Sequence, residues 1–394
     1  MPSNAWMADV FGYMFAPISA EEFFQDYHEK KALICKRGEP GRYLDLLSIE
    51  RIDELVSTLD LQTGQLDMTR ADPPVDPSQY SFESGKIDRG GVADQFQKGA
   101  TVILPQLHMN DPRLASFCRA LETRLSCHVQ SNIYLTPPDA QGFKTHYDDH
   151  DVFVLQVSGS KSWRLYNTPV ENPYRGENFE PGVHEAGEPV EEFILEAGDC
   201  AYVPRGLMHD ALTHGDEPSL HITVGLIVKT WADLMLEVVS QVALETPEFR
   251  RSLPVGFARP DFDRTALASE FQTLVAAIGE HASLDEAMDL FTDNFIRSRV
   301  PFTDGTIARF NLAKDENQAF RLRTNLPWRF AEDGEELVII TAGGEVRFPA
   351  AAEAGLHALL DGGTITAASF PDLEPEQRTT TMSRLYAYGI AEPV

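Results

Sequence analysis

The segment Gly198–His209 reads GDCAYVPRGLMH, and the fold can be worked out from it in both directions. Its first two residues, a glycine and an aspartate, are typical of a turn that leads into a strand. The apolar residues that follow form that strand, and Pro204 and Gly206 then favour a second, tight turn. The segment therefore predicts that the chain delivers His209 on the next strand.

Short β-rich runs alternate with turns on both sides of this segment, from about residue 96 to 230. Their spacing predicts an antiparallel barrel or sandwich, interrupted by one helix from Pro112 to Leu125. In spacing and residue type, the segment resembles the second metal-binding motif of cupin-type double-stranded β-helix proteins. The expected strands are Ala100–Leu104, His128–Leu135, Val152–Val157, Ser162–Tyr166, Glu192–Leu195, Cys200–Val203 and Leu220–Ile227.

A second candidate for metal binding is the triplet His146-Tyr147-Asp148. In an extended strand alternate side chains share one face, so His146 and Asp148 should point the same way, with Tyr147 opposite. Together with His209 they would supply the facial triad of non-haem Fe(II), which leaves three octahedral positions open for a bidentate co-substrate and oxygen. The plain alternatives are a polar loop for the triplet and a core histidine for His209.

Lys161 is a third candidate, in the run GSKSWRLY of residues 159–166. A lysine inside a strand of this kind, beside Trp163, needs a partner if it is buried. The carboxylate of a bound ligand is a natural partner. A lysine at a surface edge is the alternative interpretation.

These motifs together resemble the JmjC-domain ribosomal oxygenases, over essentially the whole chain. Members of that family are 2-oxoglutarate- and Fe(II)-dependent hydroxylases of ribosomal protein side chains. The resemblance implies an α+β fold built on a JmjC/cupin double-stranded β-helix barrel. The stretches that carry it are Asn132–Pro137, His146–Gln156, Gly159–Trp163, Pro204–His209 and Leu220–Thr223.

The resemblance also implies roles for single residues. The implied iron ligands are His146, Asp148 and His209, and Lys161 would pair with the distal carboxylate of 2-oxoglutarate. Asn132 and Tyr134 would line the co-substrate or substrate side of the pocket, and Thr223 would add a hydrogen bond. Related sequences carry a serine where this chain has Gly225, which removes any contact from that position. His150 and His221 are interpreted as neighbours of the site, because the triad is already complete.

The remaining parts of the chain surround residues 96–230. Residues 1–95 are expected to be a mainly helical lead-in with a short strand near residue 33 and a long loop at 70–91. Residues 231–300 form helices whose apolar stripes cover either a second subunit, as a dimerisation region, or the same chain. Residues 301–394 should be a small winged-helix-like α+β module. The stripes are Trp231, Leu234, Met235, Val238 and Val242, and then Phe271, Leu274, Val275 and Ile278.

The charge of the chain narrows the function further. Its 394 residues include 33 Lys and Arg against 61 Asp and Glu, a net charge of −28. This argues against a general nucleic-acid or anionic-membrane binder and favours a basic partner. Four scattered cysteines predict a reducing, cytoplasmic location, and no segment has the roughly 18 consecutive apolar residues of a membrane span.

The sequence therefore predicts an Fe(II)- and 2-oxoglutarate-dependent oxygenase that hydroxylates an arginyl or histidyl side chain of a basic ribosomal protein or peptide, working as a homodimer. Action on another peptide or on methyl-lysine uses the same centre and stays open. A non-enzymatic cupin-like binding protein and a winged-helix DNA regulator are the alternatives from other classes. The intact triad counts against the first of these, and the acidic C-terminal module counts against the second.

Overall fold

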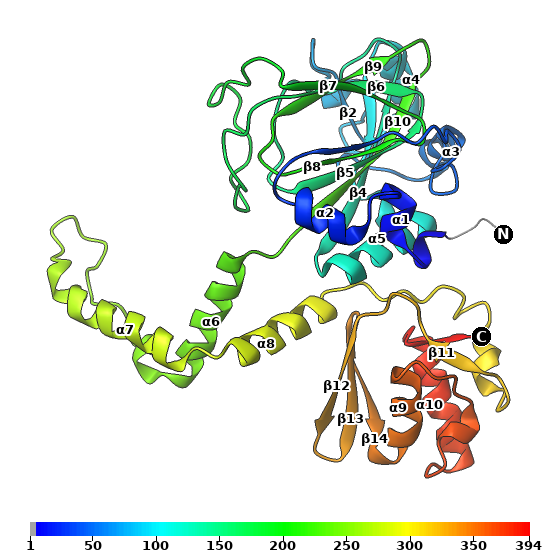
Figure 1. Cartoon of the computed structure of the whole chain (residues 1–394), viewed down its shortest axis with the longest axis vertical. Coiled ribbons are helices and arrows are strands. Elements are labelled where there is room, and N and C mark those ends of the chain that lie inside the picture. Colours follow the sequence, from blue (N-terminus) through cyan, green and yellow to red (C-terminus); the bar gives the residue numbers. More distant parts are fainter. Residues whose placement is uncertain (1–4) are drawn as a thin grey trace. The chain divides into compact units, whose positions relative to one another are not determined.

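The computed structural model describes residues 5–394, apart from the side chain of Ala266, and the chain folds as two compact units (Figure 1). The first unit ends at Val228 and the second begins at Lys229. The finer division into four parts stays a prediction. Within the described residues, no helix combines the length and apolar character needed to cross a membrane.

Two antiparallel sheets and five helices make up the first unit. Seven strands form one sheet in the order β1-β8-β5-β10-β4-β3-β2, and three form the other in the order β7-β6-β9. The helices are α1 (Val10–Phe15), α2 (Ala20–Asp26), α3 (Ile49–Thr58), α4 (Arg89–Gln97) and α5 (Pro112–Leu125). The strands are β1 (Leu33–Cys35), β2 (Asp67–Thr69), β3 (Thr101–Leu104), β4 (His128–Thr136), β5 (Asp151–Ser158), β6 (Ser160–Leu165), β7 (Glu191–Glu196), β8 (Cys200–Val203), β9 (His209–His214) and β10 (Ser219–Ile227).

Strand β5 is buried on both faces because it separates two cores. Val152 and Val154 pack with Trp163 of β6 on the side of the three-stranded sheet. Phe153 and Leu155 point the other way, into the large core shared with the N-terminal helices. Alternation along a fully buried strand explains why this run is almost entirely apolar.

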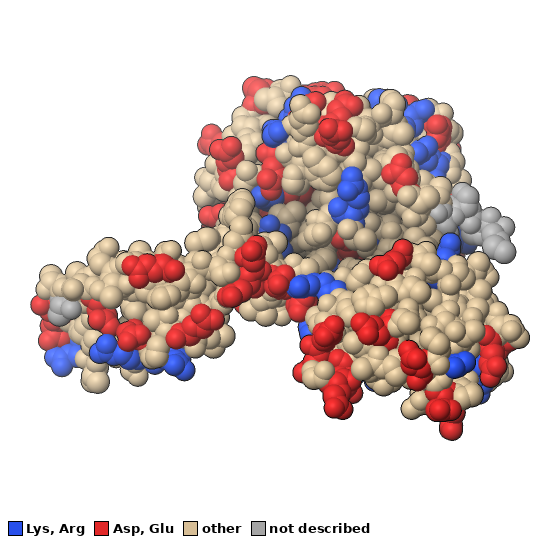
Figure 2. All heavy atoms as spheres, turned by 60° about the horizontal axis from the view of Figure 1, so that its bottom comes forward, with Lys and Arg blue, Asp and Glu red and all other residues tan. Residues whose placement is uncertain are grey.

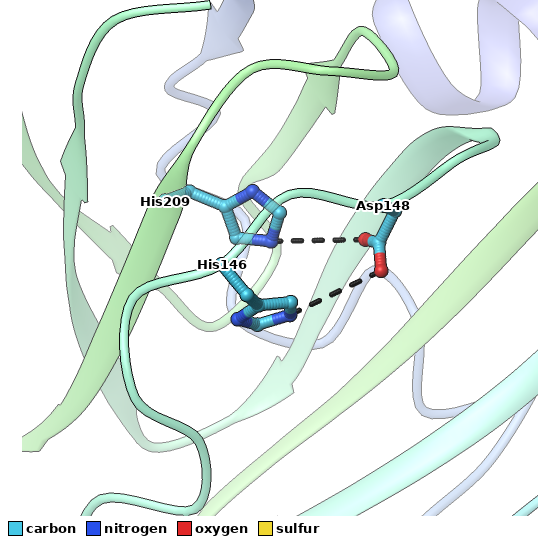
Figure 3. A group of neighbouring side chains, drawn as sticks. All are labelled: His146, Asp148 and His209. Atoms are coloured by element: carbon cyan, nitrogen blue, oxygen red, sulfur yellow. Dashed lines mark ion pairs between the residues drawn. The ribbon is translucent and has the colours of Figure 1, made fainter. Parts of the chain in front are cut away.

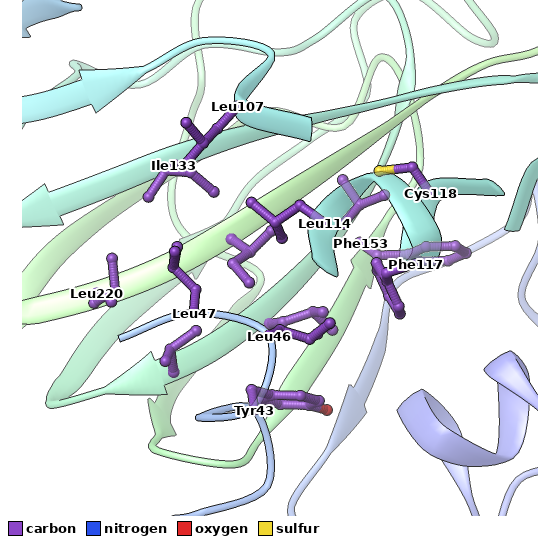
Figure 4. Packing of buried hydrophobic residues seen from close by; sticks show 14 of the residues in the cluster. Tyr43, Leu46, Leu47, Leu107, Leu114, Phe117, Cys118, Ile133, Phe153 and Leu220 are labelled. Atoms are coloured by element: carbon purple, nitrogen blue, oxygen red, sulfur yellow. The ribbon is translucent and has the colours of Figure 1, made fainter. Parts of the chain in front are cut away.

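The outer face of the seven-stranded sheet is covered by α1, α2 and α5 (Figure 1). Phe15 meets Phe153 edge to face, with ring centroids 5.0 Å apart. Phe117 and Leu114 of α5 lie beside Phe153 in the same core (Figure 4). The aromatic residues of the helical lead-in therefore fill this face of the sheet, and the opposite face is the one that borders a cavity.

The second unit begins with three helices and continues into a small α+β module. Its helices are α6 (Trp231–Glu245), α7 (Ala268–His281), α8 (Leu284–Arg297), α9 (Glu353–Leu360) and α10 (Pro375–Ala387). Its strands are β11 (Phe320–Leu322), β12 (Trp328–Asp333), β13 (Glu336–Thr341), β14 (Gly344–Pro349) and β15 (Ala391–Pro393). Strands β12, β13 and β14 form one sheet, and β11 pairs with β15.

The apolar stripe expected on α6 is partly buried and partly exposed to solvent. Leu234 and Val238 pack against Ala287 of α8, inside the unit. Trp231 and Met235 from the same stripe remain 78% and 51% exposed. The chain covers part of the stripe itself, and the rest faces outward.

Replacing Phe153 by alanine tests the core that carries the sheet. Phe153 is fully buried, so Phe153→Ala should lower the free energy of unfolding by about 3–5 kcal/mol, through lost transfer energy and a residual cavity. Phe82→Ala is the matched control because Phe82 is 55% exposed, and it should change stability by about 0.5 kcal/mol or less. Urea unfolding measures both, and a similar small loss in the two variants would contradict this view of the core.

Candidate metal centre

His146, Asp148 and His209 converge in the first unit (Figure 3). One nitrogen or oxygen from each lies within 4.8 Å of the others. Nε2 of His146 is 3.9 Å from Oδ1 of Asp148, and Nε2 of His209 is 3.7 Å from Oδ2 of Asp148. Two imidazoles and a carboxylate at this spacing fit a divalent first-row metal such as Fe(II), with open positions beside it.

Both imidazoles are oriented by their other ring nitrogen. Nδ1 of His146 is 2.8 Å from the carbonyl oxygen of Lys144, and Nδ1 of His209 is 3.0 Å from that of Leu207. Because a carbonyl only accepts, each Nδ1 carries the proton, and each Nε2 keeps its lone pair for a metal. Burial, together with the nearby His146, also lowers the pKa of His209, which favours the neutral ligand form.

The triplet around His146 lies in a loop and not in the extended strand that the sequence predicted. His146 forms only an isolated bridge with His209, through backbone hydrogen bonds of 3.1 and 2.7 Å. The predicted alternation still holds, because Tyr147 packs away from the triad against Tyr166 and Met208. A single bridge is enough to place the two histidines side by side.

Two buried carboxylates that the sequence did not single out as functional support the ligand-bearing segments. Asp210 accepts hydrogen bonds from Thr145 Oγ1 at 2.6 Å, Tyr166 OH at 2.7 Å and Arg164 Nε at 2.8 Å. Burial raises its pKa, but these three bonds outweigh burial and hold the pKa below its usual value. Asp210 therefore fixes the residues that adjoin His146 and His209.

The second carboxylate, Asp151, binds the guanidinium of Arg205 at 2.6 Å, and Glu29 binds the same group at 2.6 Å. His28, Glu29 and Asp151 come within metal-ligand distance of one another. A cation already lies between the two carboxylates, so this cluster is an ion-pair network. It anchors the turn that precedes His209.

A cavity of about 330 Å³ adjoins the triad and contains Lys161 at its wall. Lys161 is 5% exposed, and burial lowers its pKa to about 7. Among the described residues, its ammonium makes a hydrogen-bond contact with Nδ1 of His221, at 3.5 Å. Lys161 is thus a buried lysine without a carboxylate partner among residues 5–394.

Of the other pocket residues expected from the sequence, Tyr134 and Thr223 line the same cavity, whereas Asn132 does not. Tyr134 stacks on His221, with ring centroids 5.0 Å apart, and both line the cavity with Thr223. Asn132 lies opposite Thr223 in the β4–β10 register, but its Oδ1 accepts a hydrogen bond from the backbone of Gln106 at 3.0 Å. The ligand-binding roles of these residues stay predictions.

A wider hollow of about 690 Å³ also adjoins the triad. Its lining combines the triad residues His146 and Asp148 with His150 and with the long loop before β7. The site therefore has an inner cavity with one cation and an outer hollow large enough for a side chain and its backbone. The sequence motifs pointed to the residues of the inner cavity. They did not point to the loop before β7, because it lies outside these motifs along the chain.

Comparison with known proteins defines the class. Residues 104–234 match the family model described as JmjC domain, so the chain contains a JmjC domain. The structure of YcfD, a ribosomal oxygenase from Escherichia coli in complex with cobalt and 2-oxoglutarate, is similar over 96% of this chain and 99% of its own, with a TM-score of 0.57 and 15% identity. This likeness shows the fold, a JmjC/cupin barrel with mixed helices and sheets.

Relatives with higher identity define the family. Ribosomal oxygenase 1 from Gallus gallus is 33% identical over 311 residues, which are 75% of this chain and 51% of that protein. The bifunctional lysine-specific demethylase and histidyl-hydroxylase NO66 from Dictyostelium discoideum is 30% identical over 353 residues, 84% of this chain and 68% of that protein. The chain belongs to the JmjC-domain ribosomal oxygenase family. It spans about half the length of the Gallus gallus relative.

The buried lysine makes stability depend on pH. Because the pKa of Lys161 falls from 10.5 to about 7 on folding, the unfolded chain holds a proton between these values that the folded chain has released. The free energy of unfolding should therefore rise with pH across this window, and the full cost of the charge is present below it. Lys161→Met removes the charge and should stabilise the protein by about 2–4 kcal/mol below the window.

Urea unfolding of the wild type and Lys161→Met, at about pH 6.5 and about pH 9.5, measures this difference. The variant should be the more stable of the two at the lower pH, and its advantage should shrink at the higher pH. An advantage that is equal at both pH values would mean that Lys161 keeps its ordinary pKa in the folded protein.

Proposed function

We propose that this protein is an Fe(II)- and 2-oxoglutarate-dependent oxygenase that hydroxylates an arginyl or histidyl side chain of a ribosomal protein. The observation that carries the proposal is one cavity that holds both the triad His146, Asp148 and His209 and the buried Lys161. A metal centre alone would fit many reactions. A buried cation without a carboxylate partner among residues 5–394, in the wall of the same cavity, fits a co-substrate with a second carboxylate.

The chain's own residues would bind and orient the reactants. His146, Asp148 and His209 would hold the iron, and Lys161 would pair with the distal carboxylate of 2-oxoglutarate. The bound iron would supply oxygen activation coupled to oxidation of the co-substrate. The cavity, walled by Trp163 and Tyr134, excludes water around this pair of charges and so strengthens their attraction.

A basic protein segment suits the overall charge of the protein. Acidic side chains outnumber basic ones on the face shown in Figure 2, as expected from the net charge of −28. Such a field raises the encounter rate with a cationic partner. The hollow beside His146 and Asp148 would admit the target side chain. Nucleic-acid binding is not expected, and the winged-helix-like character of the C-terminal module and a cytoplasmic location stay predictions.

Mass spectrometry of ribosomal proteins tests the proposal directly. Ribosomal proteins incubated with the purified protein, Fe(II), 2-oxoglutarate and oxygen should gain the mass of one oxygen atom on a single arginine or histidine. His209→Ala should abolish the gain, because the triad loses a ligand. His214→Ala is the matched control, since His214 is an exposed histidine at the other end of the same strand, β9.

A demethylated methyl-lysine peptide, with no hydroxylated product, would instead support the alternative activity at the same centre. If the wild-type protein neither oxidises a peptide nor converts 2-oxoglutarate, while it still binds the metal, the cupin-like binding protein becomes the better description.

We also propose that the protein is a homodimer that pairs through the helices of residues 231–300. Helix α6 alone exposes four large apolar side chains, and α7 and α8 expose several more. A monomer rarely leaves so many apolar side chains on neighbouring helices in water. The residues concerned are Trp231, Met235, Leu236 and Leu244 on α6, Phe271 and Val275 on α7, and Leu284, Met288 and Leu290 on α8.

Light scattering after size exclusion tests the dimer. The wild type should elute with twice the mass of one chain at micromolar concentration. Leu236→Glu should shift the protein to one chain, because Leu236 is 64% exposed and a charge there would be buried in the interface. Leu44→Glu, at a 49% exposed leucine of the first unit, is the control and should leave the mass unchanged. A wild-type protein with the mass of a single chain would refute the dimer.

A further inference from the structure

A close neighbour explains why position 225 of β10 is a glycine. It pairs with Gln130 of β4 on one side and with Val152 of β5 on the other. A Cβ atom at this position would lie 2.7 Å from Cδ2 and 2.8 Å from Nε2 of His150. The backbone of Gly225 is not in the left-handed region that favours glycine, so the need is for space. The imidazole of His150 fills the place of a side chain at 225.

The ring of His150 is held from its other edge. Nδ1 of His150 is 3.2 Å from Oδ1 of Asp149, and the second oxygen of Asp149 accepts a hydrogen bond from the backbone of Gly176 at 3.4 Å. A carboxylate only accepts, so the hydrogen lies on Nδ1. Nε2 has no hydrogen-bond partner among residues 5–394. The ring therefore keeps one acceptor, on the edge that packs over Gly225.

His150 lies on the substrate side of the site. It lines the outer hollow together with His146 and Asp148, but it does not line the inner cavity that contains Lys161. A contact from His150 would therefore be made to the target side chain and not to the co-substrate.

We propose that His150 is a specificity-determining residue that selects an arginyl target, with Gly225 making room for it. The inference rests on the proposed function and narrows its substrate. A guanidinium carries five N–H donors, no acceptor and a positive charge. Nε2 of His150 can accept from one donor, and the carboxylate of Asp149 beside the ring attracts the charge. An aliphatic target side chain would leave Nε2 without a partner, at a cost in affinity.

The test measures binding, so it does not depend on turnover. Three peptides of one basic sequence, with Arg, His or Leu at the central position, would be titrated against protein loaded with Co(II) and 2-oxoglutarate, with fluorescence anisotropy as the readout. The wild type should bind the Arg peptide most tightly, by about tenfold over the Leu peptide, since one hydrogen bond to a charged group is involved.

His150→Ala should remove most of this preference. Gly225→Ser should do the same, because the added side chain displaces the ring. The double variant His150→Ala/Gly225→Ser should lose no more than either single variant, since both act through one ring. His150→Asn, which keeps an acceptor oxygen, should restore part of the preference. Retained Co(II) and 2-oxoglutarate affinity would show that every variant keeps its inner site.

Three outcomes overturn the inference: an equal loss for all three peptides in His150→Ala, additive losses in the double variant, or a wild type that prefers the His peptide. Failure of the proposed function gives a different result. In that case the protein would bind no 2-oxoglutarate in the presence of Co(II), whatever its preference among the peptides.

Discussion

Three backbone hydrogen bonds join the two segments that carry the candidate metal ligands, and the rest of the site depends on them. Two connect His146 and His209, and the third runs 2.9 Å from the amide of Gly206 to the carbonyl of Asp148. They tie a loop to a turn without any metal. Asp210 and the Asp151–Arg205 pair then hold the same segments from the side. The triad is therefore assembled by the fold, and a metal would enter a geometry already prepared for it.

The inner cavity lowers the stability of the folded protein, because it buries a lysine. A lysine whose pKa is lowered to about 7 by burial is a destabilising choice for a core position. Burial and the nearby Lys161 keep the pKa of His221, 3.5 Å away, well below its usual value, so that histidine stays neutral. A neutral imidazole brings no negative charge to pair with the ammonium. A carboxylate ligand would remove the strain by completing an ion pair. The destabilisation that buried Lys161 causes and the anion binding that we propose for the cavity thus have the same physical source.

Much of the barrel could be predicted from the sequence because its strands are short, apolar and separated by turns. The helix Pro112–Leu125 and the strand Cys200–Val203 have the bounds that the sequence predicted. Strand β12 was missed because Trp328–Asp333 alternates in polarity over its first three residues only. Strands β2 (Asp-Met-Thr) and β15 (Ala-Glu-Pro) were missed because they are short and have little apolar character, unlike the equally short β1 (Leu-Ile-Cys). The triplet at His146 was assigned to a strand because its side chains point alternately to opposite sides. In the structure they do so in a loop that makes a single β-bridge.

The partners of the site residues could not be predicted, because they come from segments that are distant along the chain. The contact between His150 and Gly225 joins a loop to a strand 75 positions away, and only the missing side chain at 225 marked it in the sequence. A glycine whose backbone has an ordinary strand conformation indicates that another group approaches closely. Here the neighbour is an imidazole that faces the outer hollow. The imidazole of His150 and a side chain at position 225 would occupy the same space, so the two positions depend on each other. A change in either residue therefore alters the shape that the hollow presents to a substrate.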